Sequence, residues 1–548
     1  MIILEGLSAS SGIAQGNLIF LASDGCVPTK QTVQDRSAEI MRADRAVETA
    51  SVQLKELYNK ALSGAGEETA AIFEVHSMIL EDESFLTRIH EIIGTQSVSA
   101  EYAVHTAGEE FAGIFSNMEN DYMKGRATDI CDIARRVLNI LQGVTGNLQE
   151  FVSKPSVIAA EELLPSQTMM LDKKQVLAFV TKTGSVNSHA SILARSLGIP
   201  MVTALGDGFA SLAEGDEVIV DGTKGRIISN PDSSTAALYQ KEMEKMEEAA
   251  LRLKNIIDKP ACTKDGATIK LYANIGHPDE AMAALKNGAE GIGLFRSEFL
   301  YLGAKEFPSE DQQFDAYKKV LEIMSPRRAV IRTLDLGADK NADYFRLPEE
   351  ENPAMGYRAI RICLDHPEIF VPQLRALLRA SVYGDLGIMF PMITNIEEVR
   401  SIRNIIKTVK DNLKSEGIPY SEAVEFGIMI ETPAAVMVAD KLAEEVDFFS
   451  IGTNDLTQYT LAADRMNNKV KYLMEAGRTA VLRMVKMTVD AAHSKGIEVG
   501  ICGESAADLS LLPCYIAMGI DELSMAAPQI LKVKEAVLNL EKASCPEI

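Results

Sequence analysis

His189 stands where a predicted strand gives way to a predicted helix. The strand ends at Thr181, and a turn of small residues, Gly184 to Ser188, precedes the helix. A helix N-terminus supplies unpaired N–H groups and a positive dipole end, which favour a phosphoryl group on a nearby imidazole. Neutral imidazole is a nucleophile near pH 7, and Arg195 offers a charge-assisted hydrogen bond. His189 is therefore a candidate for covalent phosphorylation, with a helix-capping or core histidine as the open alternative.

A second group of polar residues lies further along the chain, where short apolar segments end. Arginine presents a planar fork that suits carboxylate or phosphate, and Glu431 and Asp455 are hard oxygen ligands that suit Mg2+ bridged to a phosphate. The implied ligand is a small molecule with phosphate and carboxylate groups. Any one of these arginines alone could simply form a surface ion pair, but that explanation fits the whole set of arginines poorly. The arginines are Arg296, Arg332, Arg358 and Arg465.

Cys502 follows another of these segments, beside Gly503. A lone cysteine is usually a small buried apolar residue. A thiol with a pKa near neutral can instead exchange a proton with carbon or oxygen. From the residues alone, both interpretations of Cys502 stay open.

Eight short apolar strands, separated mostly by helical patterns, follow Pro260. This alternation indicates a (β/α)8 barrel, in which chemistry gathers at the C-terminal ends of the strands. The fold would carry the residues above to one rim, together with Glu298 and Asp335, which also follow strands. The expected strands are Leu271–Ile275, Gly291–Phe295, Ala329–Leu334, Gly387–Met392, Phe426–Ile430, Phe448–Thr453, Val499–Ile501 and Glu522–Met525.

The N-terminal half predicts a small domain interrupted by helices. Short strands with turns occupy residues 1–30 and 144–230, which we expect to form one discontinuous α/β domain around His189. Four helical stretches with short connections fill 31–143 and predict an antiparallel bundle. They begin near Gln34 and continue over Glu67–His90, Ser99–Met118 and Asp121–Leu141.

Residues 231–259 join this half to the barrel at 260–548. Their stretch 233–257 is rich in Ala, Glu, Lys and Met and predicts a long exposed helix. We expect a linker with hinges at its ends. The whole chain is thus predicted to be a multidomain α/β protein.

Composition limits the classes of function. The chain has 55 Lys and Arg against 78 Asp and Glu, a formal charge of −23. This acidity argues against binding to nucleic acid or anionic membranes and allows an acidic docking face for a basic partner. Seven scattered cysteines without a C-x-x-C pair are typical of a reducing compartment. Since no segment predicts a signal peptide or membrane insertion, we expect a cytoplasmic protein.

The other six histidines show no metal-ligand spacing. We interpret them as surface or core residues, with His76 a candidate for a docking face. No Walker-type phosphate loop is present in the sequence, so nothing indicates direct use of ATP.

Together these residues resemble Enzyme I of the bacterial phosphoenolpyruvate:sugar phosphotransferase system, over essentially the whole chain. The most specific segments are Ser450–Tyr459 and Cys502–Glu504, and, in the bundle, Ile72–His76, which separates this family from its relatives. The likeness also includes Pro165–Thr168, the His189 segment, Gly288–Arg296, Arg332–Asp335 and Gly356–Arg361.

The resemblance implies a Mg2+-dependent phosphoenolpyruvate–protein phosphotransferase, the first enzyme of that system. In the family, phosphoenolpyruvate phosphorylates the histidine matched by His189, which passes the group to HPr, a small histidine-containing phosphocarrier. Cys502 matches the group that protonates the enol carbon to give pyruvate, and Glu431 and Asp455 match the Mg2+ ligands. The matched substrate-binding positions are Arg296, Arg332, Arg358, Asn454, Asp455 and Arg465.

The resemblance also implies that HPr docks on the bundle and that the barrel forms a homodimer. His189 would have to swing into the barrel mouth, with the helix at 233–257 as the lever. The residues expected to contact the carrier are Glu67, Glu68, His76 and Arg126.

The sequence departs from the family at several positions. Ser185, Val186 and Asn187 replace the usual Gly, Arg and Thr before His189, and Ser84 stands where an acid often serves HPr docking. These changes bear on turnover rate and the choice of carrier, since the side chains matched to chemistry are retained. Common glycines near the substrate site are replaced by Ala338, Met466 and Ala507.

Two other functions stay open. Phosphoenolpyruvate synthase and pyruvate phosphate dikinase share the phosphohistidine and barrel parts, but they need an ATP-grasp domain, for which we expect no room in 548 residues. The second alternative is a signalling protein that binds a carrier but does not catalyse a reaction. Val186 and the replaced glycines are the reason for considering it.

Overall fold

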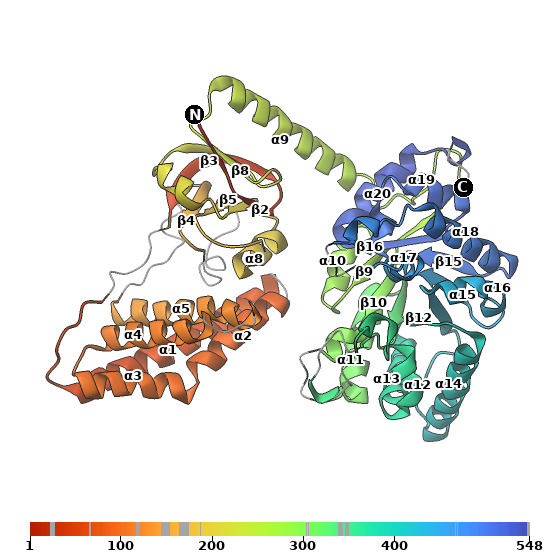
Figure 1. Ribbon diagram of the computed structural model, residues 1–548, viewed down its shortest axis with the longest axis horizontal. Coiled ribbons are helices and arrows are strands. Elements are labelled where there is room, and N and C mark those ends of the chain that lie inside the picture. Colours follow the sequence, from red (N-terminus) through yellow and green to blue (C-terminus); the bar gives the residue numbers. More distant parts are fainter. Residues whose placement is uncertain are drawn as a thin grey trace. The chain divides into compact units, whose positions relative to one another are not determined.

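The computed structural model forms two compact units, Met1–Glu248 and Ala249–Ile548 (Figure 1). Some side chains in otherwise described segments also lie outside the described part of the structure, among them those of Glu67, Glu68, Arg126 and His189. The structure describes the chain apart from residues 22–27, 65–66, 117–120, 144–153, 164–174, 187, 303, 305, 338–342, 346–349, 466, 468 and 545–548.

A mixed eight-stranded sheet lies at the centre of the first unit, in the order β1-β8-β7-β3-β4-β5-β6-β2. Strands β3 to β6 run parallel, and the flanking pairs are antiparallel. β4 is buried along its whole length, as its apolar sequence requires. The strands are β1 (Ile2–Glu5), β2 (Leu7–Ser10), β3 (Ile13–Phe20), β4 (Ser156–Ala160), β5 (Val176–Thr181), β6 (Met201–Thr203), β7 (Glu217–Asp221) and β8 (Arg226–Ser229).

Helices α1 to α5 are inserted between β3 and β4 and enclose their own apolar core, which includes Leu54, Phe73, Ile89 and Val104. The predicted α/β domain interrupted by a helical bundle is therefore confirmed. The helices are α1 (Arg36–Gly64), α2 (Glu67–Leu80), α3 (Glu83–Gln96), α4 (Ala100–Ser116) and α5 (Asp121–Leu141).

This bundle differs from the prediction in one element. The single helix expected over Glu67–His90 is wrong, because α2 ends at Leu80 and α3 begins at Glu83. Asp82 caps α3, since its side chain accepts a hydrogen bond from the backbone N–H of Ser84 (2.7 Å). Local capping chemistry outweighs the continuous apolar pattern here.

Helix α8 (His189–Leu197) follows the turn that the sequence singled out and packs on two sides. Ala190 and Ala194 are buried with residues of the sheet, whereas Leu193 is buried with the core of the bundle. The helix that begins at His189 therefore contacts both parts of the first unit.

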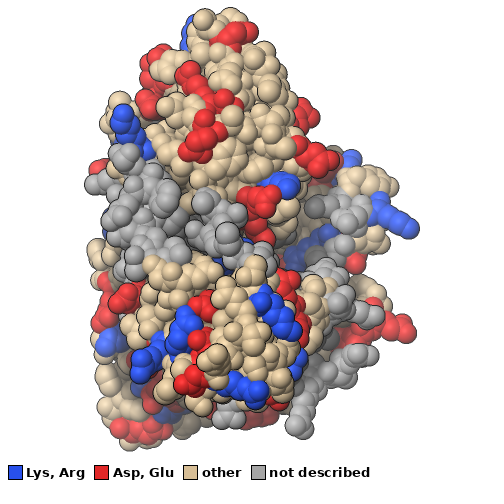
Figure 2. Space-filling model, turned by 90° about the vertical axis from the view of Figure 1, so that its left-hand side faces the viewer, with Lys and Arg blue, Asp and Glu red and all other residues tan. Residues whose placement is uncertain are grey.

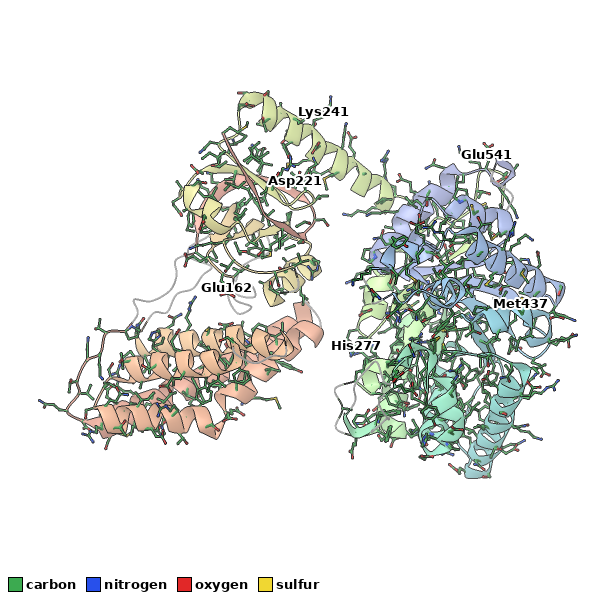
Figure 3. The ribbon with its side chains drawn as sticks, in the orientation of Figure 1. Glu162, Asp221, Lys241, His277, Met437 and Glu541 are labelled. Carbon is green, nitrogen blue, oxygen red and sulfur yellow. The ribbon has the colours of Figure 1, made fainter. Side chains whose placement is uncertain are left out.

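The predicted linker is helix α9 (Ser233–Lys254), and the division between the two units falls within it. Tyr239 in its first half is buried, and its hydroxyl donates to Oδ2 of Asp221 (3.2 Å), which is labelled in Figure 3. The first half of α9 is thus held against the sheet.

The second unit is a closed barrel of eight parallel strands, as predicted (Figure 1). Each expected strand is present, with small shifts at its ends. The strands are β9 (Lys270–Ile275), β10 (Ile292–Arg296), β11 (Arg328–Arg332), β12 (Asp385–Phe390), β13 (Glu425–Ile430), β14 (Phe448–Ile451), β15 (Glu498–Ile501) and β16 (Glu522–Ala526).

Helices surround this barrel and enclose a large apolar layer with its outer face. A separate apolar cluster, which includes Leu294, Met389 and Phe448, fills the interior. The helices are α10 (Glu280–Lys286), α11 (Glu310–Met324), α12 (Ile360–Asp365), α13 (Pro367–Ala380), α14 (Ile396–Glu416), α15 (Pro433–Met437), α16 (Ala439–Leu442), α17 (Thr453–Leu461), α18 (Thr479–Ser494), α19 (Leu512–Met518) and α20 (Ala527–Asn539).

The surface carries charges of both signs. On the face shown in Figure 2, acidic and basic side chains are interspersed over the lower part. None of the described helices is long and apolar enough to cross a bilayer.

Candidate active site

The polar residues singled out in the barrel lie at the C-terminal ends of its strands. Arg296 and Arg332 are the last residues of β10 and β11, Glu431 directly follows β13, and Cys502 directly follows β15. Asp455 lies in the first turn of α17, just after β14. Because all eight strands are parallel, these positions share one rim.

Arg332 is buried between two carboxylates. Its Nη2 lies 2.7 Å from Oε1 of Glu298, and its Nη1 lies 2.8 Å from Oδ2 of Asp335. Burial disfavours the charged form of Arg332, but Glu298 and Asp335 outweigh it and raise its pKa above the ordinary value. Arg332 is therefore a permanent cation with a fixed orientation.

The same arrangement continues on the other side of Asp335. Arg358 donates from Nη2 to Oδ1 of Asp335 (2.7 Å), and its Nη1 lies 3.7 Å from Oδ1 of Asp455. Arg465, which is more exposed than Arg332 and Arg358, places Nη1 3.7 Å from Oδ2 of Asp455. Six charges thus alternate along the rim in the order Glu298, Arg332, Asp335, Arg358, Asp455 and Arg465.

Some guanidinium groups of the rim arginines are still available to bind a ligand. The buried Nε atoms of Arg332 and Arg358 have no hydrogen-bond partner within the described residues. Arg296 is exposed and has no ion pair to the described part of the chain. Asn454 instead pairs with Glu504, whose backbone N–H donates to Oδ1 of Asn454 (3.2 Å). An anion bound at the rim would find unused guanidinium N–H groups.

Glu431 is the most enclosed acid of the rim. Its Oε1 accepts a hydrogen bond from the backbone N–H of Met392 (2.6 Å), and no part of its side chain is exposed. Burial, together with the charges of Asp455 and Asp335, raises the pKa of Glu431 to about 8. The nearby cation Arg332 lowers this pKa but does not offset those effects.

The donor set fits a divalent cation. Oε2 of Glu431 and Oδ1 of Asp455 are buried and accept no hydrogen bond from the described residues. Magnesium is commonly held by one or two carboxylates, with substrate phosphate and water completing its coordination. Within the described chain, no group of three or more His, Cys, Asp or Glu side chains is arranged for a metal. Glu431 and Asp455 therefore suit a metal shared with a substrate.

Cys502 lies inside the barrel rather than on its open surface. Its side chain belongs to the apolar interior cluster, and its Sγ is 3.8 Å from the carbonyl oxygen of Ile451. Burial raises the pKa of the Cys502 thiol to about 11. At neutral pH the residue is therefore a thiol, suited to donate a proton rather than to accept one.

The turn before His189 is held by side chains of α8. Ser188 caps the helix by accepting from the backbone N–H of Ser191, whose hydroxyl donates to the carbonyl of Ser185 (2.7 Å). Arg195 donates from Nη1 to the carbonyl oxygens of Ala9 (2.8 Å) and Val186 (2.7 Å). Arg195 thus braces the turn through its Nη1 atom. The His189 ring itself lies outside the described residues.

His76 does not lie on a docking face. It is completely buried between α2 and α5, with Nε2 3.1 Å from Oδ1 of Asp129 and Nδ1 4.0 Å from Oδ2 of Asp132. The expected direct contact with a carrier is corrected, because two buried carboxylates surround the ring. The other proposed docking side chains, Glu67, Glu68 and Arg126, lie outside the described residues, as do the replaced residues Asn187, Ala338 and Met466.

Sequence reasoning gave no role to three residues of this site. Glu298 and Asp335 were placed at strand ends, but only the tertiary structure pairs them with arginines. The Arg332-x-x-Asp335 spacing is the one signal that could have suggested their contact. Met392 acts through its backbone N–H, which no residue type reveals.

The fold and the site define a barrel protein whose rim is suited to a small molecule carrying phosphate and carboxylate groups. Models of the phosphoenolpyruvate (PEP)-utilising enzymes match the chain in three consecutive parts. The N-terminal model matches residues 5–126, the mobile-domain model 152–225, and the PEP-binding-domain model 251–542.

Similar proteins cover the whole chain. The phosphoenolpyruvate-protein phosphotransferase of Geobacillus stearothermophilus is 45% identical over 545 residues, which are 100% of this chain and 94% of that protein. Those of Staphylococcus carnosus and Bacillus subtilis are each 42% identical, with 100% and 98% of this chain and 95% of each relative covered. The chain belongs to the phosphoenolpyruvate-protein phosphotransferases, a family of PEP-utilising enzymes, as the resemblance predicted.

Proposed function

We propose that this enzyme transfers the phosphoryl group of PEP to His189 with the help of Mg2+, and then to the histidine of an HPr-type phosphocarrier protein. Pyruvate is the other product, and the reaction begins a sugar phosphotransferase system. The observation that carries the proposal is the alternating series of charges at the rim, beside two buried carboxylate oxygens that accept no hydrogen bond from the described residues. The names of the relatives support the same reaction class.

The rim arginines are suited to the substrate. Arg332 and Arg358 keep their mutual orientation because Asp335 joins them, and the Nε–H group of each has no hydrogen-bond partner among the described residues. Exposed Arg296 adds a guanidinium, and Asn454 and Arg465 complete the proposed set. Such fixed cations offset charge on a transferring phosphoryl group without reorganisation.

In the proposed transfer, the bond between phosphorus and the enol oxygen breaks and a phosphorus–nitrogen bond to His189 forms. The electron pair left on oxygen becomes the carbonyl of pyruvate as the terminal carbon takes a proton. Cys502 is the proposed donor, since its raised pKa keeps it a thiol at neutral pH; solvent then restores the proton. Mg2+ held by Glu431 and Asp455 supplies charge neutralisation when bound.

The position of α8 supports the bundle as the carrier's docking site. Leu193, one helical turn after His189, is buried in the core of the bundle, so a carrier bound there would be close to the histidine-bearing helix. Glu67, Glu68 and Arg126 are the proposed contacts. Transfer also requires His189 to reach the barrel rim, for which α9 is the proposed lever. We further propose a homodimer through the barrel and a cytoplasmic location.

A coupled assay tests the proposal. Full-length protein is mixed with PEP, MgCl2 and a purified HPr-type carrier, and pyruvate release is followed. We expect release to depend on the carrier, to be lost in His189→Ala and to persist in His90→Ala, which alters a partly exposed histidine of the bundle. No release from the unaltered protein would contradict the proposal. Formation of PEP from ATP and pyruvate would instead favour a synthase.

A further inference from the structure

The carboxylate of Glu431 is enclosed by the backbone of the two neighbouring strands. Strand β13, which Glu431 follows, lies between β12 and β14. The chain after β12 supplies Met392, whose N–H donates to Oε1 of Glu431 (2.6 Å). The chain after β14 begins with Gly452, which faces the other oxygen. Both contacts come from main chain.

Gly452 leaves just enough room for this carboxylate. A Cβ atom at residue 452 would lie 2.6 Å from Oε2 of Glu431 and 2.9 Å from Cε of Met429. Its φ of −82° is one that any residue can adopt. The absence of a side chain at 452 is therefore explained by the space that Glu431 needs and not by backbone conformation.

Met392 shows the complementary feature. Its φ is +58°, in the left-handed region that residues with a side chain rarely adopt. This conformation accompanies the short hydrogen bond to Oε1 of Glu431. Unusual backbone conformations of this kind concentrate at functional sites, where they fix a geometry that the rest of the fold maintains.

We propose that Met392 and Gly452 are positioning residues that hold Glu431 with Oε1 occupied and would leave Oε2 available to a metal ion. The inference rests on the proposed role of Glu431 as a Mg2+ ligand. One oxygen is fixed by an N–H donor, and the other has neither a hydrogen bond within the described chain nor a Cβ against it. Any side chain at residue 452 would displace Oε2 and weaken cation binding.

Metal titration of Gly452→Ala tests the inference. The full-length His189→Ala protein serves as the parent, because it keeps PEP unreacted, and free Mn2+ is measured by electron paramagnetic resonance with PEP present. We expect Gly452→Ala to weaken Mn2+ binding at least tenfold. Equal binding by parent and variant would overturn the inference while leaving the proposed function intact. A parent that binds no Mn2+ would overturn both the metal role of Glu431 and the inference.

Gly427→Ala is the matched control. This glycine lies on β13, the strand that Glu431 follows, and a Cβ there would lie 2.4 Å from the ring of Phe448, so the change also crowds the barrel. We expect it to lower the thermal midpoint and to leave Mn2+ affinity unchanged. A similar loss of affinity in Gly427→Ala would show that general disturbance of the barrel explains the effect, which would contradict the inference.

A double variant separates positioning from instability. Glu431→Asp shortens the side chain by one methylene and so withdraws the carboxylate from residue 452. In the parent we expect Glu431→Asp to weaken Mn2+ binding. In the protein that already carries Gly452→Ala, the same change should recover part of the affinity that Gly452→Ala removes. Additive losses in the double variant would contradict the inference, and this comparison holds even if Gly452→Ala alone is poorly folded.

Discussion

Nη1 of Arg332 lies 2.8 Å from Oδ2 of Asp335, although the side chains are only 8% and 4% exposed. An ion pair that leaves water must be compensated by close contacts on all sides, and here Asp335 also accepts a hydrogen bond from Arg358. Two cations that would otherwise repel each other are thereby held side by side. The arrangement prepares a site for an anion before any anion binds.

Asp335→Asn should separate these two cations. An amide has one acceptor oxygen, so it cannot replace both charged contacts, and the free energy of unfolding should fall by about 3–5 kcal/mol. Since hydrogen bonds to charged groups contribute about 1.5–3 kcal/mol, KM for PEP should rise about 10- to 100-fold. Steady-state kinetics and urea unfolding measure the two effects.

Asp311→Asn is the control for this change. Asp311 also pairs with an arginine, Arg379 (2.8 Å), but its side chain is 80% exposed, so its loss should cost at most about 1 kcal/mol. If Asp335→Asn and Asp311→Asn behave alike, the buried series at the rim has no special role.

Cys502→Ala should slow the formation of pyruvate without abolishing substrate binding. Loss of a positioned proton donor typically costs about 10²- to 10⁴-fold in rate. Because the thiol pKa is raised to about 11, the rate contributed by Cys502 should not change through its own titration between pH 6 and 9. Deuterium incorporation at the methyl carbon of pyruvate, followed in heavy water, reports the step.

Cys514→Ala, a change on α19, is the matched control and should react at the unaltered rate. A normal rate in Cys502→Ala would assign that residue to packing alone.

Glu522→Gln should change stability in a pH-dependent way. Glu522 begins β16, and burial raises its pKa from 4.5 to about 7. Folding favours the protonated form of a carboxyl whose pKa is higher in the native state than in the unfolded chain. The contribution of Glu522 to the free energy of unfolding is therefore complete below pH 4.5 and is lost as the pH rises through 7. Glutamine mimics the neutral form. The variant should therefore match the unaltered protein at pH 4.5 and be more stable at pH 8, by about 1–3 kcal/mol.

Unfolding midpoints measured from pH 4.5 to 8.5 check this expectation. Glu322→Gln, at an exposed position on α11, should show no such divergence. If the unfolding midpoints of Glu522→Gln and of the unaltered protein change with pH in parallel, burial does not raise the pKa of Glu522.

The barrel could be predicted from sequence because its strands are buried on both faces. Strands such as β12 and β13 appear as short apolar runs, and the polar residues that follow them mark their C-terminal ends. Topology alone then brought Arg296, Arg332 and Glu431 to one rim. The candidate site was therefore predictable as a set of residues.

The contacts within that set were not predictable. Asp335 joins Arg332 and Arg358, but the choice of partner depends on how loops cross the rim in three dimensions. The burial of single side chains could not be predicted either, as His76 between two acids and Cys502 inside the barrel show. A sequence reveals the type of a residue, whereas a pKa depends on what surrounds it.

Phosphorylation of His189 by PEP is the step on which the whole proposed reaction depends. Intact-mass spectrometry of the full-length protein after incubation with PEP and MgCl2, followed by peptide mapping, tests it most directly. We expect one phosphoryl group per chain, stable to base and labile to acid, on the peptide that contains His189. An unmodified protein, or a phosphoryl group on any other residue, would contradict it.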